Sequence, residues 1–143
     1  MRQDIGKASE HMAYLVVQTQ PQQTFVRGTL IHAIRLTKGD NKNPLQTNEK
    51  VWYVNTKKPG PEISFKVAEL TETESREAMA KLKAVRLTKA PTEVGGNCVD
   101  YIRLGAEALV AAGLMQKNTK LDELTDPQGA EYKRIRKVVW GQS

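Results

Sequence analysis

Apolar and polar residues alternate through the first half of the chain with the two-residue period that is typical of β-strands. The alternation predicts four strands, at residues 13–20, 24–36, 50–55 and 62–70. Residues 38–49, between the second and third strands, are polar and rich in turn-forming residues, so we expect a loop there.

The period changes to that of a helix in the second half of the chain. Apolar positions recur at helical spacing in residues 71–87, 97–115 and 125–140, and the first of these helices begins with a capping box formed by Thr71 and Glu74. Four consecutive strands followed by three helices predict an α+β domain, in which a mostly antiparallel sheet is covered by helices. We expect residues 1–12 to be a flexible leader and residues 13–143 to form a single domain.

The composition agrees with one globular domain of this size. The chain has 143 residues, of which 39% are hydrophobic and 27% are charged, a balance that disordered and membrane-spanning proteins do not have. No apolar run approaches the roughly 18 residues that cross a bilayer, and no secretory signal is recognisable. The single cysteine excludes an internal disulfide, so a reducing, cytoplasmic location is expected.

The formal net charge of +6 permits weak attraction to phosphates or to acidic protein surfaces. The last predicted helix carries the densest basic run, whose members are Lys133, Arg134, Arg136 and Lys137. These four residues are candidates for contacting nucleic acid or an acidic protein. A solvated helix face is the commoner explanation of such a run.

Cys98 stands at the start of the most strongly predicted helix, directly after Asn97, which is a good N-cap residue. Free N–H groups and the helix dipole favour a thiolate at this position, and the same N–H groups could stabilise an oxyanion on a substrate carbonyl. The alternative is a structural role, because free cysteine is often buried as a small hydrophobic residue. We expect Asp100, in the first turn of the same helix, to face solvent.

His32 is an unusual residue for the middle of an apolar strand face, where Leu30 and Ile34 flank it. We expect it to point into the same interface between sheet and helices as Cys98. A thiol beside an imidazole is the arrangement that nucleophilic catalysis requires, because the base takes the thiol proton and later returns it to the leaving group. A buried histidine that is bonded only to structural partners is the alternative.

A third residue should orient the imidazole, and Asn55 has suitable chemistry because its carbonyl oxygen can accept an N–H of His32. Its position in the strand that follows the histidine makes this assignment possible, although a strand-ending turn residue is an equally good explanation. One cysteine and one usable histidine make no recognisable metal-ligand set, and there is no phosphate-binding loop. We therefore expect no cofactor and no metal.

A strand with the sequence GTLIHAIRL, followed by further strands and then a helix beginning NCVDYI, resembles the circularly permuted papain-like, NlpC-type superfamily of thiol hydrolases and acyltransferases. Lecithin:retinol acyltransferase-like enzymes, deSUMOylating-type peptidases and small fungal proteins belong to it. The resemblance covers about residues 25 to 115. It implies a papain-like fold in which Cys98 is the nucleophile and His32 is the base.

The leading hypothesis from the sequence is a cysteine-dependent acyl-transfer enzyme, a hydrolase or acyltransferase that acts on an amide, ester or thioester. Its substrate would be a small molecule or a peptide that carries an acyl group. The alternative is a non-catalytic basic binding module or effector on the same scaffold, which contacts nucleic acid or an acidic protein.

Overall fold

The computed structural model describes residues 13–17, 25–37, 40–55, 66–130 and 132–133. Three strands and three helices follow one another in this part of the chain: β1 Tyr14–Val17, β2 Phe25–Ile34, β3 Gln46–Asn55, α2 Glu72–Ala84, α3 Cys98–Ala111 and α4 Thr119–Thr125. The strands form one antiparallel sheet in the order β1-β2-β3. The predicted α+β class is therefore confirmed.

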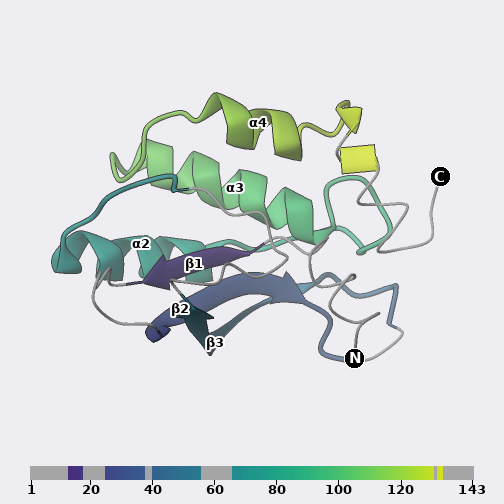
Figure 1. Ribbon diagram of the computed structural model, residues 1–143. Coiled ribbons are helices and arrows are strands. Elements are labelled where there is room, and N and C mark those ends of the chain that lie inside the picture. Colours follow the sequence, from purple (N-terminus) through teal and green to yellow (C-terminus); the bar gives the residue numbers. More distant parts are fainter. Residues whose placement is uncertain (1–12, 18–24, 38–39, 56–65, 131, 134–143) are drawn as a thin grey trace.

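The helices gather on one side of the sheet (Figure 1). Both α2 and α3 contact β2, while α4 contacts α3 and lies on the side of α3 that faces away from the sheet. The hydrophobic core consequently fills the space between the sheet and the pair formed by α2 and α3, and it continues to α4 through Leu121.

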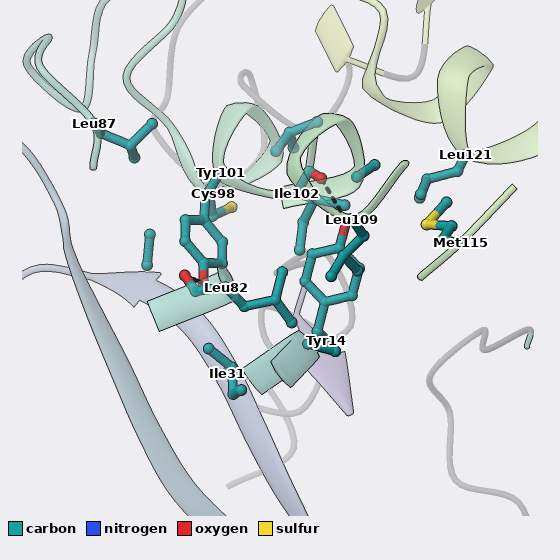
Figure 2. Packing of buried hydrophobic residues seen from close by; sticks show 14 of the residues in the cluster. Tyr14, Ile31, Leu82, Leu87, Cys98, Tyr101, Ile102, Leu109, Met115 and Leu121 are labelled. Carbon is teal, nitrogen blue, oxygen red and sulfur yellow. Dashed lines mark hydrogen bonds between the residues drawn. The ribbon is translucent and has the colours of Figure 1, made fainter. Parts of the chain in front are cut away.

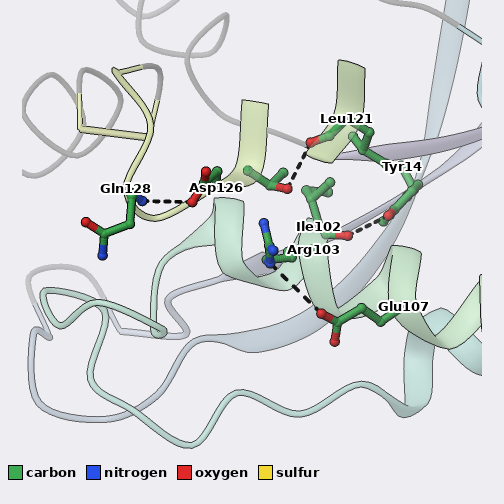
Figure 3. Close-up of polar contacts among 8 residues, drawn as sticks. Tyr14, Ile102, Arg103, Glu107, Leu121, Asp126 and Gln128 are labelled. Carbon is green, nitrogen blue, oxygen red and sulfur yellow. Dashed lines mark hydrogen bonds and ion pairs between the residues drawn. The ribbon is translucent and has the colours of Figure 1, made fainter. Parts of the chain in front are cut away.

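The central strand β2 fixes which face of the sheet meets this core. Ile31 and Ala33 are 0% and 1% exposed and belong to the core cluster, so the odd-numbered side chains of β2 point toward the helices. Tyr14 pairs with Ile31 across the sheet, and its hydroxyl donates a 2.6 Å hydrogen bond to the carbonyl of Ile102 in α3 (Figure 3).

A glycine lets α3 approach the rest of the core closely. A Cβ atom at Gly105 would stand 2.8 Å from Leu82 Cδ2 in α2 and 2.8 Å from Tyr14 Cε2 in β1. Those distances are well inside van der Waals contact, so a larger residue here would push the two helices or the strand apart.

Two strand predictions need correction. β3 begins at Gln46 rather than at residue 50, so the last residues of the predicted loop 38–49 are part of the sheet. Their polar character suggested a loop, but β3 pairs only with β2 in the described part of the chain, and an edge position tolerates polar side chains. Of the predicted fourth strand, residues 66–70 form no strand, and residues 62–65 lie outside the described residues.

The first two predicted helices are confirmed: α2 has the predicted capping box, and α3 begins at Cys98. The third helix of the structure, α4, was not predicted; it begins at Thr119 behind the N-cap Asn118. The predicted helix 125–140 begins too early, because Asp126 to Gly129 form a turn. Residues 130, 132 and 133 are helical, and the rest of that prediction, residues 134–140, lies outside the described residues.

Candidate functional site

The start of α3 is held by its own side chains. Asn97 is the predicted N-cap: its Oδ1 accepts hydrogen bonds from the backbone N–H groups of Val99 at 2.9 Å and Asp100 at 3.1 Å. In return, Asp100 Oδ2 accepts the N–H of Asn97 at 2.9 Å, which completes a capping box. This reciprocal pattern satisfies donors that a helix start otherwise leaves free.

Asp100 extends this network to neighbouring segments. Its Oδ2 also accepts the N–H of Gly95 at 2.9 Å and the hydroxyl of Tyr132 at 2.7 Å, and the side chains of Asp100 and Tyr132 are buried. The expectation that Asp100 faces solvent is therefore wrong. The Asn97-x-x-Asp100 spacing of a capping box is the sequence signal that identifies its role.

Cys98 lies inside the hydrophobic core. Its exposed fraction is 1%, and it belongs to the same buried cluster as Leu82, Tyr101 and Ile31. Figure 2 shows the sulfur on the helix side of the sheet, close to the Tyr101 ring. The Tyr101 hydroxyl donates a 2.6 Å bond to the carbonyl of Leu82, and burial raises the pKa of this tyrosine to about 12.

His32 lies on the opposite face of the sheet. Side chains alternate along a strand, and its neighbours Ile31 and Ala33 both point into the helix-covered core, so the imidazole points away from the helices. It is 6% exposed, and its Nε2 lies 3.4 Å from Nδ2 of Asn48, the residue opposite it on β3.

The structure therefore does not bring Cys98 and His32 together, contrary to the shared interface that the sequence predicted. The physical reason is the two-residue period of β2, which carries apolar residues on both faces: a shift of one position exchanges the faces. Asn55 is not brought to the imidazole either. It pairs with Phe25, seven positions along β3 from Asn48, which is about 24 Å in an extended strand.

The expected oxyanion site is also occupied. Asn97 is fully buried, its carbonyl oxygen caps α3, and the N–H groups of Gly95 and Asn97 are bonded to Asp100. A substrate oxygen would have to displace these side-chain acceptors. Asn97 therefore acts here as a helix cap.

Of the predicted basic run, the structure describes only Lys133, which is exposed. Arg134, Arg136 and Lys137 lie outside the described residues. Within the described ranges, no group of three histidine, cysteine or acidic side chains could hold a metal ion, and no helix is long and apolar enough to cross a membrane.

An open groove of about 570 Å³ lies where β3 begins and α2 ends. Its walls come from the consecutive residues Pro44, Leu45, Gln46, Thr47, Asn48 and Glu49, and from Lys83, Arg86 and Leu87 after them in the chain. We call it the β3–α2 groove. In the sequence, Lys83 and Arg86 are two of many basic residues that are spread along the chain. They border the same groove as β3 only because the end of α2 packs beside that strand.

Contacts between α2 and β3 hold the groove in shape. Thr47 Oγ1 donates a 3.0 Å bond to the carbonyl of Val85, and Lys83 Nζ lies 3.5 Å from a carboxylate oxygen of Glu49. The Arg86 guanidinium donates through Nη1 to the carbonyl of Lys83 and, at 2.9 Å, to that of Val85. Arg86 thereby satisfies one carbonyl near the end of α2 and the carbonyl of its C-cap residue, and both Lys83 and Arg86 lie at the wall of the groove.

Comparison with known proteins finds no family model, no curated protein and no solved structure that matches the chain. The papain-like resemblance therefore stays a prediction.

Proposed function

We propose that this chain is a non-catalytic binding module that holds an acidic segment of a partner protein in the β3–α2 groove. The observation that carries the proposal is the groove itself, an open space of about 570 Å³ with Lys83 and Arg86 in its wall. Its volume lies in the range of ordinary ligand sites, which is roughly 300–1,000 Å³.

The surroundings of Cys98 support a function without turnover. Acyl transfer needs an accessible thiol next to a base and free N–H donors for the oxyanion. Cys98 is 1% exposed, and its candidate base, His32, points to the other face of the sheet. The N–H groups near Cys98 are bonded to the side chains of Asn97 and Asp100.

The charges of the groove favour a carboxylate ligand. Lys83 and Glu49 are about half exposed, with side-chain exposures of 50% and 47%, so their ion pair contributes at most about 1 kcal/mol and an incoming carboxylate can replace Glu49. Arg86 uses Nη1 for the α2 carbonyls, which leaves Nε and Nη2 as donors for a second carboxylate. Nucleic-acid affinity comes mainly from many Lys and Arg contacts to phosphates, whereas the described wall of the groove has two cations and the carboxylate of Glu49. The groove therefore suits a short acidic protein segment better than nucleic acid.

Fluorescence anisotropy with a labelled oligoglutamate peptide tests this function. Lys83→Glu should weaken binding about five-fold or more, since reversal of one charge at the groove costs on the order of 1 kcal/mol. Lys81→Glu is the matched control, because it makes the same charge change on the same helix at an exposed residue outside the groove. Equal losses in both variants, or no binding by the original protein, would refute the proposal.

We also propose that the scaffold is the permuted papain-like one without its catalytic pair. Support comes from the order of its parts, a histidine-bearing strand before a helix that begins Asn97-Cys98. Ile31 and Ala33 hold the helix-facing positions next to His32, where a catalytic base would have to stand. Iodoacetamide should label Cys98 in the folded protein far more slowly than a free thiol, and at the free-thiol rate after unfolding. Fast labelling of the folded protein would contradict a non-catalytic site.

A further inference from the structure

The β3–α2 groove runs along the edge of a strand. Thr47 and Glu49 belong to the helix-covered face of the sheet, since they pair with Ala33 and Ile31, whereas Gln46 and Asn48 belong to the opposite face. All four line one groove. A space beside the strand, at its edge, is within reach of consecutive residues whose side chains point to opposite faces.

Within the described ranges, the outer edge of β3 has no strand beside it. β3 is bonded to β2 on one side, and no strand of the described part of the chain pairs with its other side. Every second residue of an edge strand directs its N–H and C=O groups outward, where they can bond to another extended chain.

We infer that the partner segment binds by adding a strand to the outer edge of β3 between Gln46 and Glu49, and that it carries acidic side chains at alternate positions. This inference rests on the proposed function and gives its binding mode. Backbone bonds to β3 supply affinity, while side chains on one face of the added strand supply specificity.

The alternation follows from the unequal faces of the groove. On the helix-covered face, an added strand has Lys83 and Arg86 as neighbours. On the other face its neighbours are Gln46 and Asn48, which are uncharged. Because successive side chains of a strand point to opposite faces, the carboxylates must stand at positions i and i+2 to reach both cations.

The second half of the edge has a different character. Val51, Trp52 and Tyr53 are 46%, 38% and 64% exposed, and Lys50 Nζ lies 5.1 Å from the centre of the Trp52 ring. A ligand strand that extends along this part of the edge meets apolar and aromatic surface, so apolar residues should lie next to the acidic ones in its sequence. A second copy of β3 fits this pattern poorly, since Glu49 is its only acidic residue.

Peptides of equal composition separate the binding mode from the function. One peptide alternates Glu and Thr, and the other carries all its Glu residues in one block, then all its Thr residues. The alternating peptide should bind at least about five-fold more tightly.

A further pair of alternating peptides carries N-methyl groups on every second residue, either on the Glu or on the Thr positions. One of the pair should lose binding and the other retain it, because only one set of N–H groups points at β3.

Hydrogen exchange provides the second readout. Outward N–H groups between Gln46 and Glu49 should exchange quickly in the free protein and become protected when the alternating peptide binds. Protection in the free protein would show that the edge is already covered and would overturn the inference, as would concentration-dependent protection through self-association. If both peptides bind equally and Lys83→Glu still weakens binding, strand addition fails while the proposed function stands. If neither peptide binds, both fail.

Discussion

Replacement of Gly96 by Ala should strongly destabilise the start of α3. A Cβ atom there would stand 2.0 Å from the carbonyl oxygen of Ala90 and 2.7 Å from that of Lys89. Both obstacles are backbone atoms, so the loop must move by at least about 1 Å to restore an ordinary contact. Such a shift strains the bonds that Asp100 accepts from the N–H groups on either side of Gly96, each worth about 1.5–3 kcal/mol. We therefore expect a loss of about 3 kcal/mol or more.

Urea denaturation followed by circular dichroism measures this loss as a change in the free energy of unfolding. Gly113→Ala is the control, because Gly113 has a φ of 74° and a Cβ atom added there would meet nothing within 4 Å. The Gly113→Ala variant should therefore lose only about 1–2 kcal/mol, which is the cost of a residue with a Cβ atom in the left-handed backbone conformation. A Gly96→Ala loss below that of Gly113→Ala would refute the steric reasoning.

Two further predictions concern buried polar groups. Burial raises the pKa of Tyr101 from 10.0 to about 12 and that of Tyr14 further, so the stability that these protonated tyrosines provide is intact below pH 10 and declines as the pH rises through about 12. Alkaline titration by circular dichroism should show unfolding in this interval. A fold that is already lost below pH 10, or that is unchanged well above pH 12, would contradict this prediction. Asp100→Ala removes the acceptor of two backbone N–H groups and of the Tyr132 hydroxyl, so it should lower the free energy of unfolding in urea by about 2–4 kcal/mol. Tyr132→Phe removes one of these bonds and should lower it by about 1 kcal/mol. Similar costs for both variants would show that Asp100 does not hold the helix start.

Local signals predicted much of the fold. The capping box at Thr71 and the Asn97 cap are each written in a few adjacent residues, and both helices begin where those residues indicate. β2 was equally readable as a strand. α4 was missed because its seven residues offer too short an apolar pattern, and Asn118 was its only clear start signal.

The candidate site was less predictable than the fold. Whether His32 or Ile31 faces the helices cannot be read from a strand that is apolar on both sides, since both faces satisfy the same alternation. The edge position of β3 decided that polar residues 46–49 form a strand, and the packing of α2 beside that edge brought Lys83 and Arg86 to one groove.

The sequence alone determined the α+β class, the starts of α2 and α3, and the basic charge of the chain, because capping, periodicity and net charge depend on neighbouring residues or on composition. Only the tertiary structure decided which face of β2 is covered, and therefore that Cys98 and His32 are separated by the sheet. It also decided which cations share a groove. Those outcomes depend on packing between segments that are distant in the chain, where no local pattern distinguishes one arrangement from the other.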